Sequence, residues 1–266
     1  MRRPYGTAHV VLSALLLLTG CAARPAPRPA EVAIGALPAA PRILAAVAER
    51  REAVRGLRAM ARLSYSAPDE SRRVKQLVIV ERPDRLRFEV LSPFGALFVL
   101  TAADGALAAW TRDESTVYRG TASADNLQRY AQVDLPVGTA VDLLLGTPPL
   151  AANSDSVVSA DDGAVELWQE IGPAVQVAWF TPALELLRYE QRDGDGRVLL
   201  RTTFDQYATI DGVRVATQLG IELPPASRRI DITFSETEVN PVLTDAVFAL
   251  ETPAGSREVD LDRVPQ

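Results

Sequence analysis

The chain has very little of three residue types that carry much of enzyme chemistry. Its 266 residues contain one cysteine (Cys21), one histidine (His9) and one lysine (Lys75). His9 and Cys21 both lie in the first 21 residues, in the segment identified below as a signal peptide and its lipid-attachment site. No histidine or free thiol then remains for a Ser-His-Asp triad, a Cys-His triad or a metal site built on these residues. A phosphate-binding P-loop is also absent, because its lysine must follow a glycine-rich run. The sequence therefore predicts no catalytic triad, no metal and no cofactor.

Acidic residues are frequent, but none stands out as a catalytic pair. The chain has 34 Asp and Glu against 28 Lys and Arg, a net charge of −6 that suits nucleic acid poorly. Asp193 and Asp195 resemble the start of a calcium loop, but Arg197 occupies the next ligand position, so this segment predicts a hairpin turn. A hydrolase that uses two carboxylates stays open as an alternative. We expect a protein that is not an enzyme and binds no nucleic acid.

The one cysteine follows a short apolar run at the start of the chain. Arg2 and Arg3 precede an apolar stretch over residues 10–18, and Thr19 and Gly20 lead into Cys21. A stretch of this length is about half of the ~20 residues that a membrane-spanning helix needs. The pattern predicts a lipoprotein signal peptide over residues 1–20 and attachment of lipid to Cys21. Its removal would change the net charge from −6 to −8, since two arginines leave with it.

The remaining chain divides into a tether and one domain. Residues 21–41 are rich in proline and alanine, a composition that favours an extended, solvated segment. Residues 42–54 have the apolar spacing of a short helix, and residues 126–131 and 138–145 are also helical in character. Gly146 and the prolines after it mark the end of the last helix. We expect residues 42–266 to form a single domain.

Most of that domain alternates between apolar and polar residues, which is typical of half-buried strands. Asp-Gly pairs at 104–105, 162–163 and 211–212 separate several of these segments and indicate hairpin turns. The expected strands cover residues 57–65, 74–80, 85–91, 97–101, 107–111, 116–119, 165–169, 175–180, 185–191, 198–207, 213–223 and 230–238. The pattern predicts a mainly β fold with a few helices. A sheet of about eleven strands curves strongly, so we expect one antiparallel sheet with helices against its concave face.

The apolar faces of this sheet supply candidate site residues. They form either an ordinary core or, in part, an apolar cavity for acyl chains. The candidates are Leu86, Phe88, Val90, Trp110, Tyr118, Val141, Leu144 and Leu145. Phe94 lies between Pro93 and Gly95 at an expected hairpin tip. It is either tucked under the loop or offered to a membrane or a partner.

The order of several short motifs resembles a known family. A lipoprotein signal and a tether precede the Arg-Pro-Asp-Arg-Leu-Arg segment at 82–87 and the Leu-Ser-Pro-Phe-Gly hairpin at 91–95. Leu-Pro at 135–136 then leads to Leu-Leu-Leu-Gly-Thr-Pro at 143–148, and the chain closes with Phe-Ala-Leu-Glu-Thr-Pro-Ala-Gly at 248–255. Taken in this order, the motifs resemble the LolA/LolB superfamily of lipoprotein carriers, and within it the outer-membrane receptor branch, LolB.

This resemblance implies an unclosed β-barrel with helices plugging its open side and an apolar cavity for lipoprotein acyl chains. It also implies that Phe94, with Pro93 and Gly95, helps to place lipoproteins into the outer membrane. Ala22, where an Asp would retain lipoproteins at the inner membrane, implies an outer-membrane location. The implied partners are a periplasmic LolA-like carrier, lipoprotein acyl chains and the bilayer, and we expect a monomer. The alternative is a lipid-binding or scaffold lipoprotein of the envelope without a sorting role.

Overall fold

A computed structural model describes residues 37–152 and 155–263. Contacts within the chain separate Met1–Val32 from Ala33–Gln266, and all described residues belong to the second unit. The predicted signal peptide, the lipid attachment site at Cys21 and most of the predicted tether lie outside the described residues. Within the described ranges, no helix is both long enough and apolar enough to cross a membrane.

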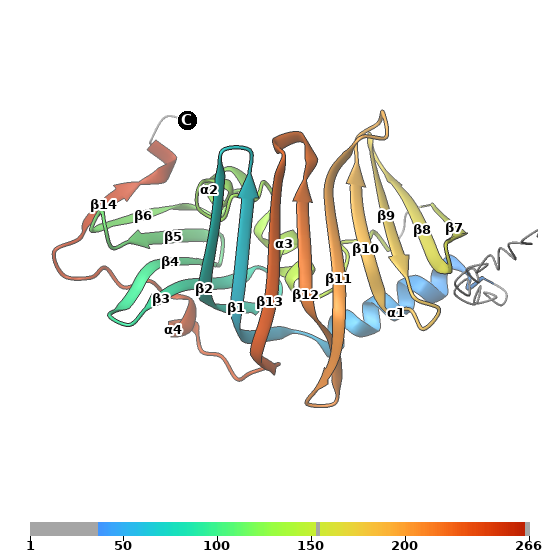
Figure 1. The fold of residues 1–266 in the computed structure, drawn as a ribbon, viewed down its shortest axis with the longest axis horizontal. Helices are drawn as coiled ribbons and strands as arrows, with labels where there is room; N and C mark the ends of the chain where they lie inside the picture. Colours follow the sequence, from blue (N-terminus) through green and yellow to red (C-terminus); the bar gives the residue numbers. More distant parts are fainter. Residues whose placement is uncertain (1–36, 153–154, 264–266) are drawn as a thin grey trace, which may run out of the picture. The chain divides into compact units, whose positions relative to one another are not determined.

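One large sheet dominates the described unit, and it is not closed into a barrel (Figure 1). Its strands lie in the order β14-β6-β5-β4-β3-β2-β1-β13-β12-β11-β10-β9-β8-β7. The strands are β1 (Gly56–Ala67), β2 (Glu70–Glu81), β3 (Arg85–Ser92), β4 (Gly95–Ala103), β5 (Ala106–Thr111), β6 (Thr116–Thr121), β7 (Ser156–Asp161), β8 (Ala164–Ile171), β9 (Ala174–Phe180), β10 (Leu186–Arg192), β11 (Val198–Ile210), β12 (Val213–Leu223), β13 (Arg228–Val239) and β14 (Arg257–Asp260).

The prediction of a mainly β fold with one unclosed sheet is confirmed, with more strands than expected. The sheet has fourteen strands where about eleven were predicted. Both β7 and β14 were missed, because they are short and lack a clear apolar alternation. All neighbours pair antiparallel except β14, which pairs parallel with β6 through Val259 and Tyr118. Because β1 pairs with β13, the first and last long strands of the chain lie side by side in the middle of the sheet.

The Asp-Gly pairs form the predicted hairpin turns. At 104–105, 162–163 and 211–212 both residues have positive φ, between 44° and 81°. Such turns match the twist of the strands on either side, and glycine adopts their second position without strain. The segment after β10 is also a turn, in which the Asp193 carboxylate accepts hydrogen bonds from the backbone N–H groups of Asp195 and Arg197. The prediction of a turn there is therefore confirmed.

The longer helices are α1 (Ala40–Ala53), α2 (Ala124–Ala131) and α3 (Val137–Leu144), and α4 (Asp245–Phe248) is a single turn. Ser123 begins α2 by accepting a hydrogen bond from the N–H of Asn126 at 3.1 Å. Gly146, with φ +68°, ends α3, as the sequence predicted. Helices α2 and α3 lie behind the sheet in Figure 1, against the face that carries Leu86 and Leu100. We call this the inner face.

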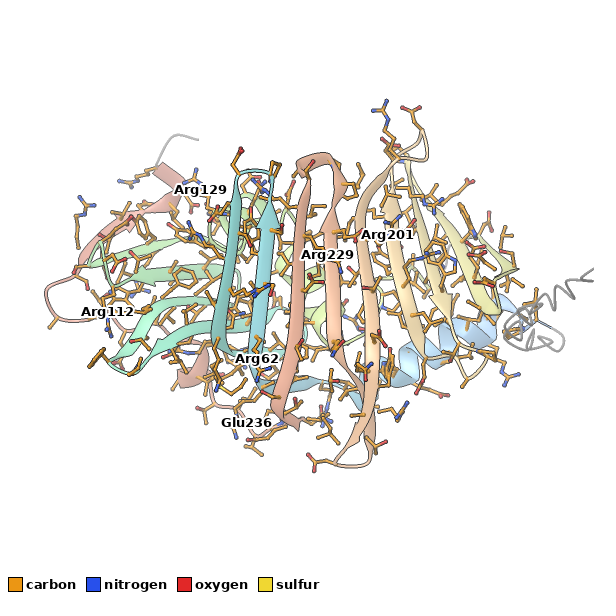
Figure 2. All side chains as sticks on the ribbon, in the orientation of Figure 1. Arg62, Arg112, Arg129, Arg201, Arg229 and Glu236 are labelled. Carbon is orange, nitrogen blue, oxygen red and sulfur yellow. The ribbon has the colours of Figure 1, made fainter. Side chains whose placement is uncertain are left out.

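The opposite, outer face of the sheet is polar. Strand alternation places Arg201, Glu222 and Arg229 side by side on β11, β12 and β13, while Ile221 and Ile230 point to the inner face. Figure 2 shows Arg201 and Arg229 on the face turned toward the viewer, away from α2 and α3. The apolar interior and the covering helices therefore share one side of the sheet.

Candidate functional site

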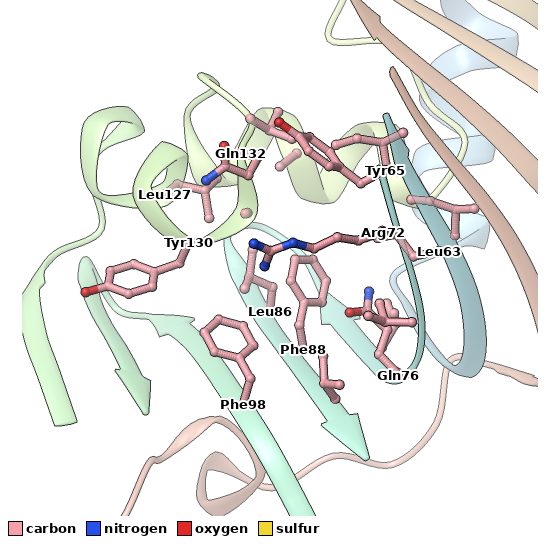
Figure 3. Close-up of a pocket in the computed structure, with 18 of the residues that line it drawn as sticks. Leu63, Tyr65, Arg72, Gln76, Leu86, Phe88, Phe98, Leu127, Tyr130 and Gln132 are labelled. Atoms are coloured by element: carbon pink, nitrogen blue, oxygen red, sulfur yellow. The ribbon is translucent and has the colours of Figure 1, made fainter. Parts of the chain in front are cut away.

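A cavity of about 540 Å³ lies between the inner face of the sheet and the helices α2 and α3 (Figure 3). Strands β1 to β5 form most of its wall, and β12 and β13 close one side. The residues that line it from the strands are Leu63, Tyr65, Glu70, Arg72, Val74, Gln76, Val78, Leu86, Phe88, Val90, Leu97, Phe98, Thr111, Ile221, Ile230 and Ile232. The other lining residues are Asp113, which follows β5, and a set from the helical region: Leu127, Arg129, Tyr130, Ala131, Gln132, Val133, Leu135, Ala140, Leu143 and Leu144.

The wall changes in polarity along its length. Val78, Leu86 and Leu143 are buried at one end, whereas Glu70 and Arg72 are exposed or half-buried at the other. The Arg72 guanidinium forms an ion pair with the Glu70 carboxylate, and both belong to the end of β2 that follows the β1–β2 turn. An apolar end and a charged end suit an amphiphilic ligand whose chain is buried and whose head remains near water.

Helix α3 is held over the cavity by a buried ionic cluster. Its Asp142 carboxylate accepts from Arg82 and, at 2.5 Å, from Arg51 of α1. Arg82 also donates to the Thr147 hydroxyl at 2.6 Å and to the Val54 carbonyl at 3.0 Å. Burial, together with neighbouring Arg51, lowers the pKa of Arg82 to about 10, so it stays charged at neutral pH. The cluster therefore joins α1, α3 and the β2–β3 turn.

Aromatic rings form the wall between α2 and β4. Tyr130 of α2 stacks on Phe98, with ring centroids 6.3 Å apart, and lies 5.6 Å from the ring of Tyr118. Burial, followed by the nearby Tyr118, raises the pKa of Tyr130 to about 12. Its phenol is therefore neutral at physiological pH, and this wall presents uncharged rings to a ligand.

The β3–β4 hairpin projects an exposed aromatic side chain near this cavity. Phe94 is 88% exposed. The Ser92 hydroxyl accepts from the Phe94 N–H at 3.2 Å and donates to the Gly95 carbonyl at 2.7 Å, while Arg112 donates to the Phe94 carbonyl at 3.0 Å. Gly95 has φ +102°, a conformation that other residues rarely adopt. These contacts hold the backbone of the tip and leave the Phe94 ring in solvent.

Four of the eight predicted cavity residues line the cavity: Leu86, Phe88, Val90 and Leu144. Trp110 does not, because it pairs with Val99 and therefore lies on the outer side of β5. Tyr118 reaches the cavity only through its contact with Tyr130. Val141 and Leu145 are buried in the core and are not among the lining residues.

Sequence reasoning missed much of the wall. It did not single out Gln76, Leu127 or Tyr130, nor Ile221 and Ile230, which are more than 130 residues from β2 in the chain. The alternation of β2 places Val74, Gln76 and Val78 on one side, and this signal could have identified that strand. The contribution of β12 and β13 depends on the pairing of β13 with β1, which alternation does not reveal.

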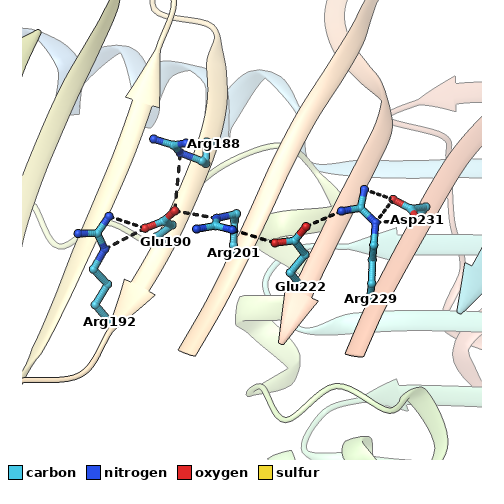
Figure 4. Close-up of polar contacts among 7 residues, drawn as sticks. All are labelled: Arg188, Glu190, Arg192, Arg201, Glu222, Arg229 and Asp231. Atoms are coloured by element: carbon cyan, nitrogen blue, oxygen red, sulfur yellow. Dashed lines mark hydrogen bonds and ion pairs between the residues drawn. The ribbon is translucent and has the colours of Figure 1, made fainter. Parts of the chain in front are cut away.

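An ion-pair network on the outer face stands apart from the cavity (Figure 4). The Glu190 carboxylate accepts from Arg192 at 2.6 Å and from Arg201 at 2.8 Å, and Arg201 also pairs with Glu222 at 3.0 Å. Burial raises the pKa of Glu190, but the hydrogen bonds from Arg201 and Arg192 outweigh this and leave its pKa below the ordinary value. Arg229 continues the network to Glu222. Arginine and carboxylate side chains alternate along it, so each carboxylate of the network is paired with arginine.

The described residues offer binding surfaces more clearly than reactive groups. In residues 37–152 and 155–263, no cluster of three or more His, Cys, Asp or Glu is arranged to hold a metal ion. The acidic side chains at the cavity, Glu70 and Asp113, lie at its polar end, and Glu70 is paired with Arg72. The arrangement can enclose an apolar chain and hold a polar group at one end.

No family model matches the chain, and no curated protein matches it in sequence. Solved structures with a similar fold exist. A DUF1329 family protein from Desulfovibrio piger aligns with TM-score 0.55 and 15% identity, over 79% of this chain and 95% of that one. A LolA superfamily protein from Nitrosomonas europaea aligns with TM-score 0.53 and 14% identity, over 78% and 97%.

A third similar structure is a domain from Vibrio parahaemolyticus named for outer membrane lipoprotein sorting. It aligns with TM-score 0.52 and 13% identity, over 78% of this chain and 95% of that domain. At these identities the likeness is one of fold. The chain shares the fold of LolA superfamily and related proteins, in which one sheet remains open.

Proposed function

We propose that this chain is a monomeric outer-membrane lipoprotein that binds the acyl chains of other lipoproteins and helps to insert them into the outer membrane. The observation that carries the proposal is the largely apolar cavity of about 540 Å³ under α2 and α3. Its volume falls within the range of about 300–1,000 Å³ that is usual for ligand sites. The fold shared with the LolA superfamily supports the same class of ligand.

Hydrophobic transfer, rather than catalysis, would drive this function. Burial of each CH₂ group contributes about 0.8 kcal/mol, so a chain of some sixteen carbons contributes roughly 10 kcal/mol. Release from such a site is fast enough only when the donor, the cavity and the bilayer bind the chain with nearly equal free energy. In our proposal a periplasmic LolA-like carrier is the donor, and the bilayer is the acceptor.

In this proposal the Phe94 side chain contacts the bilayer. Its ring is 88% exposed, and Leu91 and Leu97 on the same hairpin are exposed as well. Burying an aromatic ring of this size contributes about 1.5–3 kcal/mol, enough to bias a tethered protein toward the membrane surface. Leu97 both lines the cavity and reaches solvent. The hairpin therefore offers an apolar path from the cavity toward a bilayer on which Phe94 rests.

The anchor in this proposal is lipid on Cys21, after removal of residues 1–20. Residues 21–41 would act as the tether and residues 42–266 as the receptor domain. Ala22 after the acylated cysteine favours the outer membrane, and the anchor would keep the cavity close to the membrane that it supplies.

A transfer assay tests the proposal with variants that separate binding from insertion. The full chain carrying Cys21→Ala, which prevents its own acylation, is incubated with a radiolabelled triacylated lipopeptide and then with phospholipid vesicles. We expect the chain with no further substitution to form a complex with the lipopeptide and to release it to vesicles. Ala140→Trp, which places a large ring in the cavity, should abolish complex formation. Phe94→Ser should bind normally and transfer about tenfold more slowly, since the hairpin loses its apolar contact.

Two matched variants serve as controls. Ala45→Trp adds the same ring to an exposed position of α1, and Val242→Ser removes an apolar side chain that is 97% exposed elsewhere. Both should behave as wild type. Binding that survives Ala140→Trp would contradict the cavity as the site. Binding of lipopeptide with no transfer to vesicles by any variant would favour the lipid-binding or scaffold lipoprotein instead.

A further inference from the structure

The inner row of β2 is graded from charged to apolar along the cavity. Glu70, Arg72, Val74, Gln76 and Val78 alternate with residues on the outer face, and all five line the cavity. The row begins at the Glu70–Arg72 ion pair and ends at buried Val78. Gln76 is the exception in the apolar part of the row. Its amide points into the cavity beside Phe88 in Figure 3.

The Gln76 amide is open to the cavity and has no partner in the described part of the protein. The residue is 6% exposed, and no described residue forms a hydrogen bond with its side-chain amide. Its cross-strand neighbours are Val90 on β3 and Ala61 on β1, neither of which offers a polar side chain. A polar group that lines a cavity in this way takes its hydrogen bonds from water or from a ligand. A residue of this kind in a ligand cavity indicates a group that the ligand supplies.

A second buried glutamine, Gln169, has an amide that is hydrogen-bonded within the protein. Gln169 of β8 is 1% exposed. Its amide oxygen accepts from the Ala151 N–H at 3.0 Å, and its amide nitrogen donates to the Ala151 carbonyl at 2.8 Å and to the Ser156 hydroxyl at 3.0 Å. The sheet therefore satisfies a glutamine that it buries for structural reasons. Gln76 faces open cavity instead.

A second unpartnered polar group lies at the same level of the cavity. The strand register joins Gln76 to Val90, Val90 to Phe98 and Phe98 to Thr111, so these four residues form one row across β2, β3, β4 and β5. The Thr111 hydroxyl is buried and has no hydrogen-bond partner. The next row on the buried side is apolar, from Val78 through Phe88 and Leu100. Because the Thr111 hydroxyl has no surface open to the cavity, Gln76 is the polar side chain of this row that a ligand can meet.

We infer that this level binds a carbonyl oxygen of an ester-linked or amide-linked acyl lipid, with Gln76 as the donor. The inference rests on the proposed function and names the ligand class of the same cavity. A carbonyl oxygen only accepts hydrogen bonds, and the Gln76 amide nitrogen can donate one. The acyl tail extends from this level toward Leu86. The head group lies toward Arg72, about 13 Å from Gln76 along the strand.

A matched pair of lipids tests this assignment on the full chain carrying Cys21→Ala. Palmitoyl lysophosphatidylcholine has an ester carbonyl, and hexadecyl lysophosphatidylcholine has the same head group and chain length with an ether in its place. Calorimetric titration below the micelle concentration gives both affinities. We expect the ester lipid to bind about fivefold more tightly, which is the usual effect of one hydrogen bond. Gln76→Met should remove this preference, because methionine has no group that donates to the carbonyl.

The control variant is Gln132→Met. Gln132 lines the cavity beside α2, and its amide donates to the Arg129 carbonyl at 3.3 Å, so this variant should keep the ester preference. Equal affinity of the unsubstituted cavity for ester and ether lipids would overturn the inference and leave the proposed function intact. Failure of both lipids to bind would overturn both. The comparison of the two lipids needs no variant, so a poorly folding Gln76→Met protein would not prevent a decision.

Discussion

The inner face of one sheet has a filled half and a hollow half. In the filled half, Leu167, Tyr189 and Leu200 on β8, β10 and β11 are almost completely buried, as is Ile43 of α1. In the hollow half, β1 to β5 face α2 and α3 across a cavity of about 540 Å³. Phe88 and Val90 there are only half-buried. The two halves are built from the same alternating strands, and they differ in how completely side chains fill the space against the inner face.

The filled half stabilises the fold by close packing, whereas the hollow half is less stable because it leaves space for a ligand. Close-packed interiors lose free energy whenever a void is left. The filled half and the cluster around Asp142 therefore carry the fold, and they allow the hollow half to remain open. Variants that alter one half at a time test this difference.

The largest effect is expected from the ionic cluster that holds α3 over the hollow half. Asp142→Ala leaves Arg82 buried without its carboxylate, and such a change costs about 3–5 kcal/mol. We expect a loss of this size in the free energy of unfolding, measured by urea denaturation. Glu222→Ala, in the more exposed outer-face network, should cost less than about 1 kcal/mol. Equal losses for the two variants would contradict the role of Asp142.

Truncation of a side chain should lower the free energy of unfolding more in the filled half than in the hollow half. Leu167→Ala opens a void among fully buried neighbours and should cost about 3 kcal/mol. Phe88→Ala removes a larger side chain, but one face of it borders the cavity, so we expect about 1–2 kcal/mol. Urea denaturation of both variants measures the difference. A greater loss for Phe88→Ala would show that the cavity wall is packed as a core.

Enlargement of a side chain should also lower the free energy of unfolding more in the filled half than in the hollow half. Ala178 of β9 is fully buried, and Ala178→Leu should destabilise the protein by about 1–3 kcal/mol through overpacking. Ala140→Leu, which extends into the cavity from α3, should change stability by less than about 0.5 kcal/mol. Thermal denaturation of the pair gives the comparison. If both variants were destabilised alike, the space under α3 would not be open.

The smallest effect concerns Glu190 on the outer face, and it depends on pH. Its pKa is lower in the folded chain than the ordinary value of 4.5, so its stabilising contribution is present above pH 4.5 and declines as the pH falls through the folded pKa. Glu190→Gln should therefore cost about 1–2 kcal/mol at pH 7 and progressively less in acid. Glu236→Gln, at an exposed position of β13, is the control. A pH-independent difference would contradict this assignment.

Local patterns predicted the elements of this fold well. Alternation identified the long strands, Asp-Gly pairs marked hairpins, and Gly146 ended α3, because each feature depends on backbone geometry within a few residues. Short β14 was missed because its strand exists only through pairing with β6, 141 residues earlier in the chain.

The candidate site was predicted only in part. Leu86, Phe88 and Val90 were found because they share one face of β3. Trp110 was misplaced because alternation gives two faces and does not say which is inner. Gln76 gains its significance from the cavity that its strand faces, and alternation does not reveal that cavity. Whether apolar residues enclose a core or a cavity depends on how far α2 and α3 lie from the sheet, and composition carries no information on that distance.

Photolabelling can locate the bound acyl chain within the protein. The full chain carrying Cys21→Ala is mixed with a lipid whose palmitoyl chain bears a photoreactive group, irradiated, digested and analysed by mass spectrometry. We predict that the label appears on the lining residues of β2, β3 and α3, around Leu86, Phe88 and Leu144, and that unlabelled lipopeptide prevents it. Label on the filled half, around Leu167 and Tyr189, or label that competitor does not reduce, would contradict the account.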